Sequence, residues 1–483
     1  KGGTTKANSR GNIVKISGGG ELLLKDAVFC DGILAKSFYS GAVLVGANSR
    51  FEMTGGTIEN FTLNSQMLTG AVCVTSGGNF QMSGGIIQNN SNTYSGSYYS
   101  GGGVLLYAWN AAEKDAVMTL SGNAVIRNNT SSDGGGIYLI GNTDFKMTGG
   151  LITNNEAYGY GGGVCVAGTG GGVGAGGATA NETKFTMEGG EISDNHAYNS
   201  GGGIYINSDD VVLKGGKIEN NIAENHGGGI YVSEPPQEVK IYNAIVTENE
   251  ASVMGGGLWF CPTGDAVLTV TNGIAVYKNK ADGAGDDFVA LNGNQGIVTL
   301  ADRFLGGGSV EWYSDGGVIG GIGGGITPPQ NVTGSVDSTV PRFDPDDPGE
   351  RLTGISGSGN YALKAIVSDN TIKLAESQAK LWIAGNRARR GGGIGSNGAA
   401  LLGEQNRDYT LQVTKSWSEN TPENEKKEIL VLLKIGEYEL DSVRLNAANN
   451  WTADFTQLPD PESLEGNLQY AAVESPVPPN FTP

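Results

Sequence analysis

The chain has 483 residues, 81 of them glycine, a formal net charge of −19 and a pI near 4.6. The glycine content is far above average usage and has no collagen-like period. Because the excess negative charge repels nucleic acids and anionic membrane surfaces, neither is expected as a partner. No apolar run is long enough to span a bilayer, so no membrane insertion is expected.

A repeated motif occupies the N-terminal half, in which a glycine triplet precedes a β-branched or other apolar residue and then, in most copies, an aromatic one. Its copies lie at residues 134–138, 161–165, 201–205, 227–231 and 255–259. Two further elements recur between the triplets. One is an alternating apolar pair before a Gly-Gly corner, such as Phe145 and Met147. The other is an Ile-x-x-Asn step, such as Ile152 to Asn155.

The asparagines of these steps give the period of the repeat. Asn129 and Asn155 are 26 residues apart, and Asn221, Asn249 and Asn279 follow at intervals of 28 and 30. Each period holds short runs of alternating apolar residues between glycine-rich corners, and none has helical periodicity. The pattern predicts an all-β fold, a right-handed parallel β-helix with three strands per coil and coils about 4.8 Å apart. The asparagines, in one register, predict a ladder of hydrogen-bonded amides.

We predict that the β-helix spans residues 1–305, with a glycine-rich loop at residues 168–180. Residues 306–380 form an irregular excursion with Pro328 and Pro329 and an acidic stretch at 344–348. Since the end of a solenoid exposes strand edges that need a cap, the excursion is expected to cover the last coils, and a substrate-binding insertion is the alternative. A repeat-like coil then returns at residues 381–403.

From Tyr409 glycine becomes scarce and conventional strands begin, which predicts a C-terminal β-sandwich over residues 408–483. Four blocks carry a resemblance to the Cna B-type domain of Gram-positive surface adhesins and pilins: residues 413–417, 445–451, 455–459 and 470–478. The preceding coils resemble the pectin-lyase-like repeats of bacterial surface proteins and of chlamydial polymorphic outer-membrane proteins.

The Cna B-type resemblance implies an autocatalytic isopeptide bond. In that family a lysine of the first strand attacks the side-chain carbonyl of an Asn or Asp on the last strand, and a buried glutamate carries protons. Lys415 matches the lysine and Glu474 the glutamate. The family's acceptor follows the Pro-Val-Pro segment at a distance that places it after Pro483, and Asn480 comes too early. Lys415 is therefore expected to be unlinked in this chain.

Other chemistry is weakly represented in the coils. A polysaccharide lyase or glycoside hydrolase acting in a groove is the alternative to a binding role, since such enzymes use carboxylates with Arg, Lys or His. Only His196 and His226 are present, and the acidic pairs Asp209–Asp210 and Asp286–Asp287 lie at turns. The four cysteines, Cys30, Cys73, Cys165 and Cys261, have no metal-ligand spacing, so neither a metal site nor a cofactor is predicted.

The aromatic residues that follow the glycine triplets are the candidate binding residues. If the preceding isoleucines point inward, the strand period turns their neighbours outward, one coil apart. An outward aromatic ladder would suit sugar rings or an extended partner, and the alternative is that these rings fill the core. The candidates are Tyr138, Tyr205, Tyr231 and Trp259.

Together these features predict a non-enzymatic, monomeric surface adhesin or structural protein. The β-helix would present a binding face for a host or environmental glycan or an extracellular-matrix protein, and the sandwich would act as a stalk. The expected location is extracellular and attached to a Gram-positive cell wall, with signal peptide and anchor outside this sequence.

Overall fold

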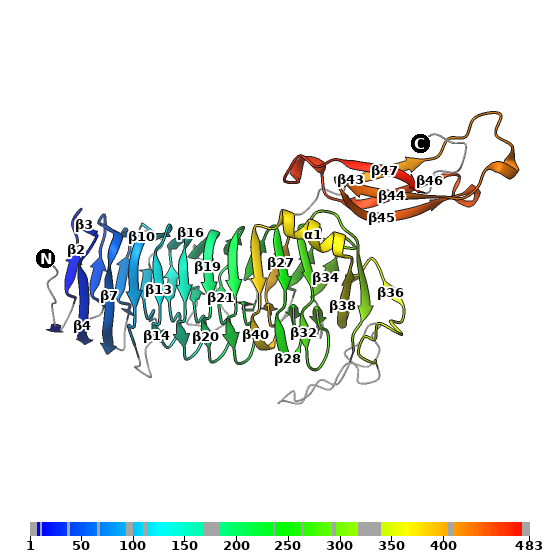
Figure 1. The fold of residues 1–483 in the computed structure, drawn as a ribbon. Helices are drawn as coiled ribbons and strands as arrows, with labels where there is room; N and C mark the ends of the chain where they lie inside the picture. The colour runs from blue at the N-terminus through cyan, green and yellow to red at the C-terminus, as the bar shows by residue number, and fades with distance from the viewer. Residues whose placement is uncertain are drawn as a thin grey trace.

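The computed structural model describes residues 7–9, 12–35, 39–64, 68–92, 100–109, 114–168, 183–234, 237–261, 265–291, 296–316, 340–403 and 409–475. The glycine-rich loop predicted at 168–180 lies almost wholly outside them. The described chain consists mostly of strands, with a single α-helix, α1 (Asp369–Gln378), which confirms the all-β prediction. The coils stand side by side in a row that leads from the N-terminus to the excursion (Figure 1).

One sheet collects the strands that follow the glycine-rich corners. In the repeated coils, the strands that follow a glycine triplet pair in parallel with their neighbours. In spatial order the parallel strands are β2 (Val14–Ile16), β6 (Val43–Val45), β9 (Val72–Thr75), β11 (Val104–Ala108), β15 (Ile137–Gly141), β18 (Val164–Ala167), β21 (Ile204–Asn207), β25 (Ile230–Val232), β41 (Ile394–Ser396), β29 (Leu258–Phe260) and β33 (Phe288–Ala290).

A second, 19-stranded sheet holds the alternating apolar pairs and the Ile-x-x-Asn steps. In several coils one long strand bends through the Gly-Gly corner and serves both runs. Its strands are β1 (Ala7–Ser9), β3 (Glu21–Leu24), β4 (Val28–Ala35), β7 (Arg50–Asn64), β10 (Asn79–Gln88), β12 (Ala116–Leu120), β13 (Val125–Arg127), β16 (Thr143–Thr153), β19 (Thr183–Ser193), β22 (Asp210–Leu213), β23 (Gly216–Glu219), β26 (Glu238–Ile241), β27 (Ala244–Thr247), β30 (Val267–Val270), β31 (Ile274–Tyr277), β34 (Ile297–Leu300), β37 (Ser356–Gly357), β39 (Leu381–Ala384) and β42 (Ala399–Leu402).

A third sheet is formed by strands that the sequence analysis did not identify, because most of them are two residues long and carry no alternation to detect. They follow the asparagine of each coil and pair in parallel. In spatial order they are β14 (Thr130–Ser131), β17 (Glu156–Ala157), β20 (His196–Ala197), β24 (Ile222–Ala223), β40 (Arg387–Arg390), β28 (Glu250–Met254) and β32 (Lys280–Ala281). A separate short parallel pair joins β5 (Tyr39–Ser40) to β8 (Leu68–Thr69).

The interior of the coils is one continuous apolar core. Like residues restack from coil to coil, so that the rings of Phe51 and Phe80 lie 4.8 Å apart and those of Phe145 and Phe185 lie 4.9 Å apart. At one corner the buried asparagines form the predicted ladder. Asn155, for example, donates from its backbone N and its Nδ2 to Asn195 Oδ1, at 3.0 Å each. Stacked side chains and stacked amides therefore both fix the register.

The returning coil lies inside the stack. Its first strand, β39, pairs with β23 on one side and with β27 on the other, and its strands β40, β41 and β42 are sandwiched in the same way. In Figure 1 this coil is yellow to gold among green ones. The asparagine count treated Asn221 and Asn249 as neighbours in the ladder, and that was wrong. Asn386 stands between them, accepting from Asn221 Nδ2 at 3.0 Å and donating to Asn249 Oδ1 at 2.9 Å.

The excursion covers the edges of the last coil with antiparallel strands. In one sheet β33 pairs with β38 (Tyr361–Val367), β38 pairs with β35 (Val310–Ser314), and β35 also pairs with β36 (Arg351–Leu352). In the other, β34 pairs antiparallel with β37. The sheets are therefore mixed at this end.

The C-terminal region is a small antiparallel sandwich with its own core. One sheet pairs β43 (Tyr409–Thr414) with β46 (Thr452–Leu458), and the other has the order β45 (Tyr438–Leu445), β44 (Ile429–Ile435), β47 (Tyr470–Ser475). It lies next to α1 (Figure 1), and Leu374 of this helix belongs to the sandwich core. The buried Arg303 joins the two parts, since its Nη2 lies 2.7 Å from Asp441 Oδ2 and its Nε donates to Thr456 O at 2.7 Å.

Candidate functional site

Lys415 and Glu474 are brought together by the sandwich. Lys415 directly follows β43, Glu474 lies on β47, and Lys415 Nζ is 2.7 Å from Glu474 Oε2. Both side chains are largely shielded, at 17% and 12% exposure, and the amine lies 5.1 Å from the centre of the Trp417 ring. Glu474 Oε1 is buried without a hydrogen-bond partner among the described residues. A carboxyl at hydrogen-bond distance from an amine can receive its proton. Asn480 lies outside the described residues.

Of the two alternatives for the aromatics after the glycine triplets, neither holds in full: the rings point away from the main core, but they are not exposed. Tyr138 and Tyr205 are 1% exposed, and Tyr231 and Trp259 are also buried. The strand alternation itself holds, because Ile137 belongs to the main core and Tyr138 to a second cluster on the other face of the sheet. That outer face is covered instead of solvated, which strand periodicity does not reveal.

The covering of this outer face comes partly from the corners themselves. A Cβ added at Gly134 would lie 2.9 Å from Tyr138 Cβ. The backbone of this glycine corner therefore covers the base of the Tyr138 side chain. Tyr160 also packs on the cluster, with its ring 4.7 Å from that of Tyr205. Cys73 and Cys165 are members of the same column.

His226 fills a gap that the inserted coil leaves in this aromatic column. Between Tyr231 and Trp259 the column position is Gly395, which has no side chain. The imidazole stacks on Trp259 with ring centres 4.9 Å apart and on Tyr231 at 5.6 Å. Burial, together with the nearby arginines Arg390 and Arg389, lowers the pKa of His226 to about 4.

We expect His226 to titrate near pH 4 and to destabilise the fold in acid. Because its folded pKa lies below the unfolded value of about 6.5, the stability it contributes is present above pH 6.5 and is lost as the pH falls towards 4. The two histidines of the chain give two imidazole resonances for NMR titration, and His196→Gln identifies the one from His226. A His226 midpoint at 6 or above would contradict the buried neutral ring.

The structure reveals a different exposed aromatic pair, on the outer face of the third sheet. Tyr158 and Tyr198 are 53% and 48% exposed, and their ring centres lie 5.7 Å apart. The ring of His196 is 4.5 Å from that of Tyr198, and His196 Nε2 is 2.9 Å from Glu224 Oε1. Sequence reasoning missed this set because it follows the two-residue strands. The available signal was the matching sequence Asn-x-Ala-Tyr at residues 155–158 and 195–198.

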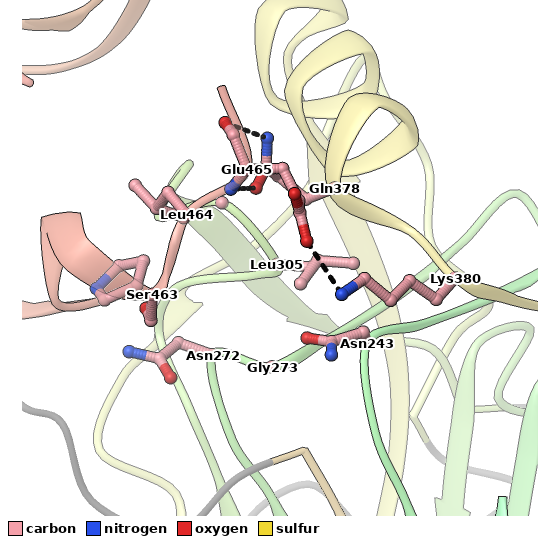
Figure 2. Close-up of a pocket in the computed structure, with 11 residues that line it drawn as sticks. Asn243, Asn272, Gly273, Leu305, Gln378, Lys380, Ser463, Leu464 and Glu465 are labelled. Carbon is pink, nitrogen blue, oxygen red and sulfur yellow. Dashed lines mark hydrogen bonds and ion pairs between the residues drawn. The ribbon is translucent and has the colours of Figure 1, made fainter. Parts of the chain in front are cut away.

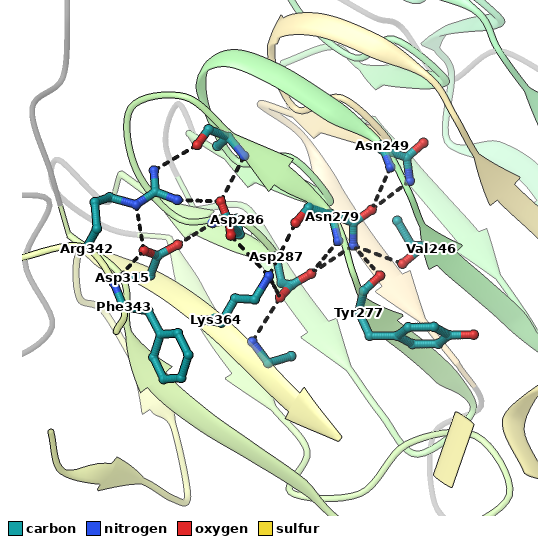
Figure 3. Close-up of polar contacts among 12 residues, drawn as sticks. Val246, Asn249, Tyr277, Asn279, Asp286, Asp287, Asp315, Arg342, Phe343 and Lys364 are labelled. Atoms are coloured by element: carbon teal, nitrogen blue, oxygen red, sulfur yellow. Dashed lines mark hydrogen bonds and ion pairs between the residues drawn. The ribbon is translucent and has the colours of Figure 1, made fainter. Parts of the chain in front are cut away.

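The acidic pairs have different surroundings. Asp209 is exposed at the start of a strand, whereas Asp286 is held by Arg342 and by Lys364, whose Nζ is 3.0 Å away (Figure 3). Asp287 is fully buried and ends the ladder, accepting from Asn279 N and Nδ2 at 3.0 Å each. Burial raises its pKa to about 6, against the opposing effect of Lys364. Asp286 and Asp287 thus hold the excursion on the last coil.

A pocket lies where the sandwich meets the coils, beside the point at which the chain enters the inserted coil. Lys380 pairs with Glu465 at 2.7 Å, and Gln378 Oε1 accepts from Glu465 N at 2.7 Å (Figure 2). Lys380, Gln378 and Asn272 of this pocket are occupied in joining the two parts, since Asn272 Nδ2 also donates to Gln457 O at 2.9 Å. Within the described ranges no three His, Cys, Asp or Glu side chains gather in a way that could hold a metal ion. The same ranges contain no helix long and apolar enough to cross a membrane.

The C-terminal region is thus an all-β sandwich with a largely shielded lysine–glutamate pair that joins its two sheets. Residues 411–483 match the family model of the Cna protein B-type domain. Domains of this family occur in Gram-positive surface proteins and suggest a structural, stalk-like role. Comparison of the chain with curated proteins and with solved structures finds no match.

Proposed function

We propose that the protein is an adhesin-like structural protein attached to the cell wall of a Gram-positive bacterium. The stacked coils form a pectin-lyase-like right-handed parallel β-helix that presents a binding face for a glycan or an extracellular-matrix protein. The Cna B-type domain is its stalk. The match at residues 411–483 carries this proposal, and the arginine-based junction between sandwich and coils supports it, because a stalk must hold what it presents.

A binding role fits the coils better than a catalytic one. Asp286 is engaged with two basic residues and Asp287 ends the asparagine ladder, so both have structural partners. His226 is stacked between aromatic rings, and Asp209 stands at an exposed turn. None of these groups forms the paired acid and base that glycoside cleavage uses.

A screen of the protein against a glycan array and immobilised extracellular-matrix proteins tests the function. We expect saturable binding to at least one ligand and no release of reducing ends or unsaturated products from pectins, alginate or glycosaminoglycans. Turnover that is lost in Asp209→Asn or Asp286→Asn would favour the lyase or hydrolase instead. Absence of both binding and turnover would leave only a spacer role and reject the adhesin.

Isopeptide formation is part of the proposal for the stalk. In protein extended past Pro483, Lys415 is expected to bond to an Asn or Asp with loss of one ammonia or one water, while Glu474 takes the proton from the amine. The cross-link constrains the unfolded chain as a disulfide does, which corresponds to about 3 to 5 kcal/mol. Intact-mass measurement of the extended protein checks this, with Lys415→Ala as the variant that retains the full mass. An unchanged wild-type mass would show that the family's chemistry does not operate here.

A further inference from the structure

Three successive coils place a compact group of side chains on one exposed surface. Tyr158, Tyr198 and Glu224 occupy equivalent positions, since the backbone N of each donates to the matching carbonyl of the previous coil at 3.0 to 3.1 Å. Two residues earlier in each coil, Glu156, His196 and Ile222 are also in register. These six residues are called the tyrosine face below.

The rings of the tyrosine face are both exposed and held in place. The carboxylate of Glu156 lies near enough to Tyr198 to raise the pKa of its phenol. His196 packs against the same ring while contacting Glu224 at 2.9 Å. Their ring centres lie 5.7 Å apart, somewhat more than the strand spacing of about 4.8 Å between adjacent coils. Other large apolar side chains of the described coils are exposed singly, among them Leu23, Ile33 and Trp109. Tyr158 and Tyr198 differ from these because both rings of a stacked pair are about half exposed, so this pair needs an explanation.

The groups around Tyr158 and Tyr198 indicate which kind of ligand the tyrosine face can bind. The strands beneath them are paired on both sides, so no free strand edge is offered to an extended peptide. Two carboxylates, Glu156 and Glu224, flank the rings and repel a polyanion, in a chain that is already strongly acidic. Carboxylates accept hydrogen bonds from hydroxyl groups, and aromatic faces pack against the apolar faces of sugar rings.

We propose that the tyrosine face binds an uncharged polysaccharide whose chain runs along the stacking direction of the coils. Successive sugar rings lie on Tyr158 and Tyr198, and Glu156 and Glu224 accept their hydroxyl groups. This inference rests on the proposed adhesin function and specifies the class of its ligand and the place where it binds.

Native electrophoresis through gels that contain β-glucan, xyloglucan or galactomannan tests the site, with polygalacturonate and hyaluronate gels as the polyanionic comparison. We expect at least one neutral polysaccharide to retard the wild type and neither polyanion to do so. The double variant Tyr158→Ala/Tyr198→Ala is expected to weaken this binding at least about tenfold, which is 1.4 kcal/mol or more. Phenylalanine at both positions should retain most of it, because the ring faces remain.

Tyr409→Ala is the matched control, since Tyr409 is a similarly exposed tyrosine on the sandwich and its loss should leave retardation unchanged. Thermal unfolding of each variant verifies that the coils remain folded. The site is rejected if no neutral polysaccharide retards the wild type, or if the alanine double variant is retarded equally. In either case, the alanine double variant is then tested in the glycan and matrix screen. If it binds as well as the wild type there, the adhesin function is retained and its ligand binds another face.

Discussion

Replacing Gly392 with alanine is expected to push the inserted coil out of the stack and to destabilise the protein by about 3 kcal/mol or more. A Cβ at this position would lie 2.4 Å from Glu250 O and 2.6 Å from Gly256 O, both backbone atoms of the next coil. Because Gly392 also donates its N–H to Gly255 O at 3.1 Å, the glycine segment before β41 cannot withdraw without losing this hydrogen bond.

Urea denaturation and chymotrypsin digestion measure the effect. Tyr242 and Asn243 connect β26 to β27, which lie on opposite sides of the inserted coil. If the inserted coil leaves the stack, this connection should become accessible, and chymotrypsin should cleave after Tyr242. Gly46→Ala is the matched control, since its nearest neighbours would lie at 3.3 Å and its φ is not positive. Equal stability of the two variants would contradict the tight fit of the inserted coil.

The position of that coil was beyond the reach of sequence reasoning for a physical reason. Residues 381–403 carry the same triplet and asparagine as the other coils, which is why a returning coil was predicted. Every coil, however, offers nearly identical strand edges and an identical ladder position. The repeat pattern of the sequence therefore does not determine between which coils residues 381–403 lie. The order is set by chain geometry, because β26 and β27 leave one level vacant between them and α1 delivers the chain to it.

The functional residues divide along a similar line. Lys415 and Glu474 were found from the sequence because the motifs of one family fix their positions on two strands. The surroundings of Tyr138 and Tyr205 stayed open between an exposed ladder and the core, because alternation distinguishes the two faces of a sheet but does not say what covers the outer one. The tyrosine face follows strands too short to show alternation, so only the Asn-x-Ala-Tyr repeat could have revealed it.

The amide ladder shows how strongly the repeat depends on one residue type. Asn195 Oδ1 accepts from the backbone N and the Nδ2 of Asn155, and Asn195 Nδ2 donates to Ile152 O and to Asn221 Oδ1, all at 2.9 to 3.0 Å. A side-chain amide offers the two donor hydrogens and the acceptor oxygen that these bonds use. Asp287 is tolerated at the ladder's end because its neighbours there are donors, namely Asn279, Ala365 N and Lys364.

Replacing Asn195 with alanine should therefore cost about 3 to 5 kcal/mol, because the backbone N of Asn155 and the carbonyl of Ile152 lose their amide partner in a fully buried place. Asn195→Asp keeps the acceptor but removes the donor to Ile152 O and buries a charge, so it should be least stable at neutral pH and recover as the carboxyl is protonated in acid. Urea unfolding followed by tryptophan fluorescence gives both values, and the exposed Asn123→Ala should change stability by less than about 0.5 kcal/mol. If Asn195→Ala were as mild as Asn123→Ala, the stacked apolar side chains alone would hold the coils in register, and the ladder would be a consequence of the stack without contributing to its stability.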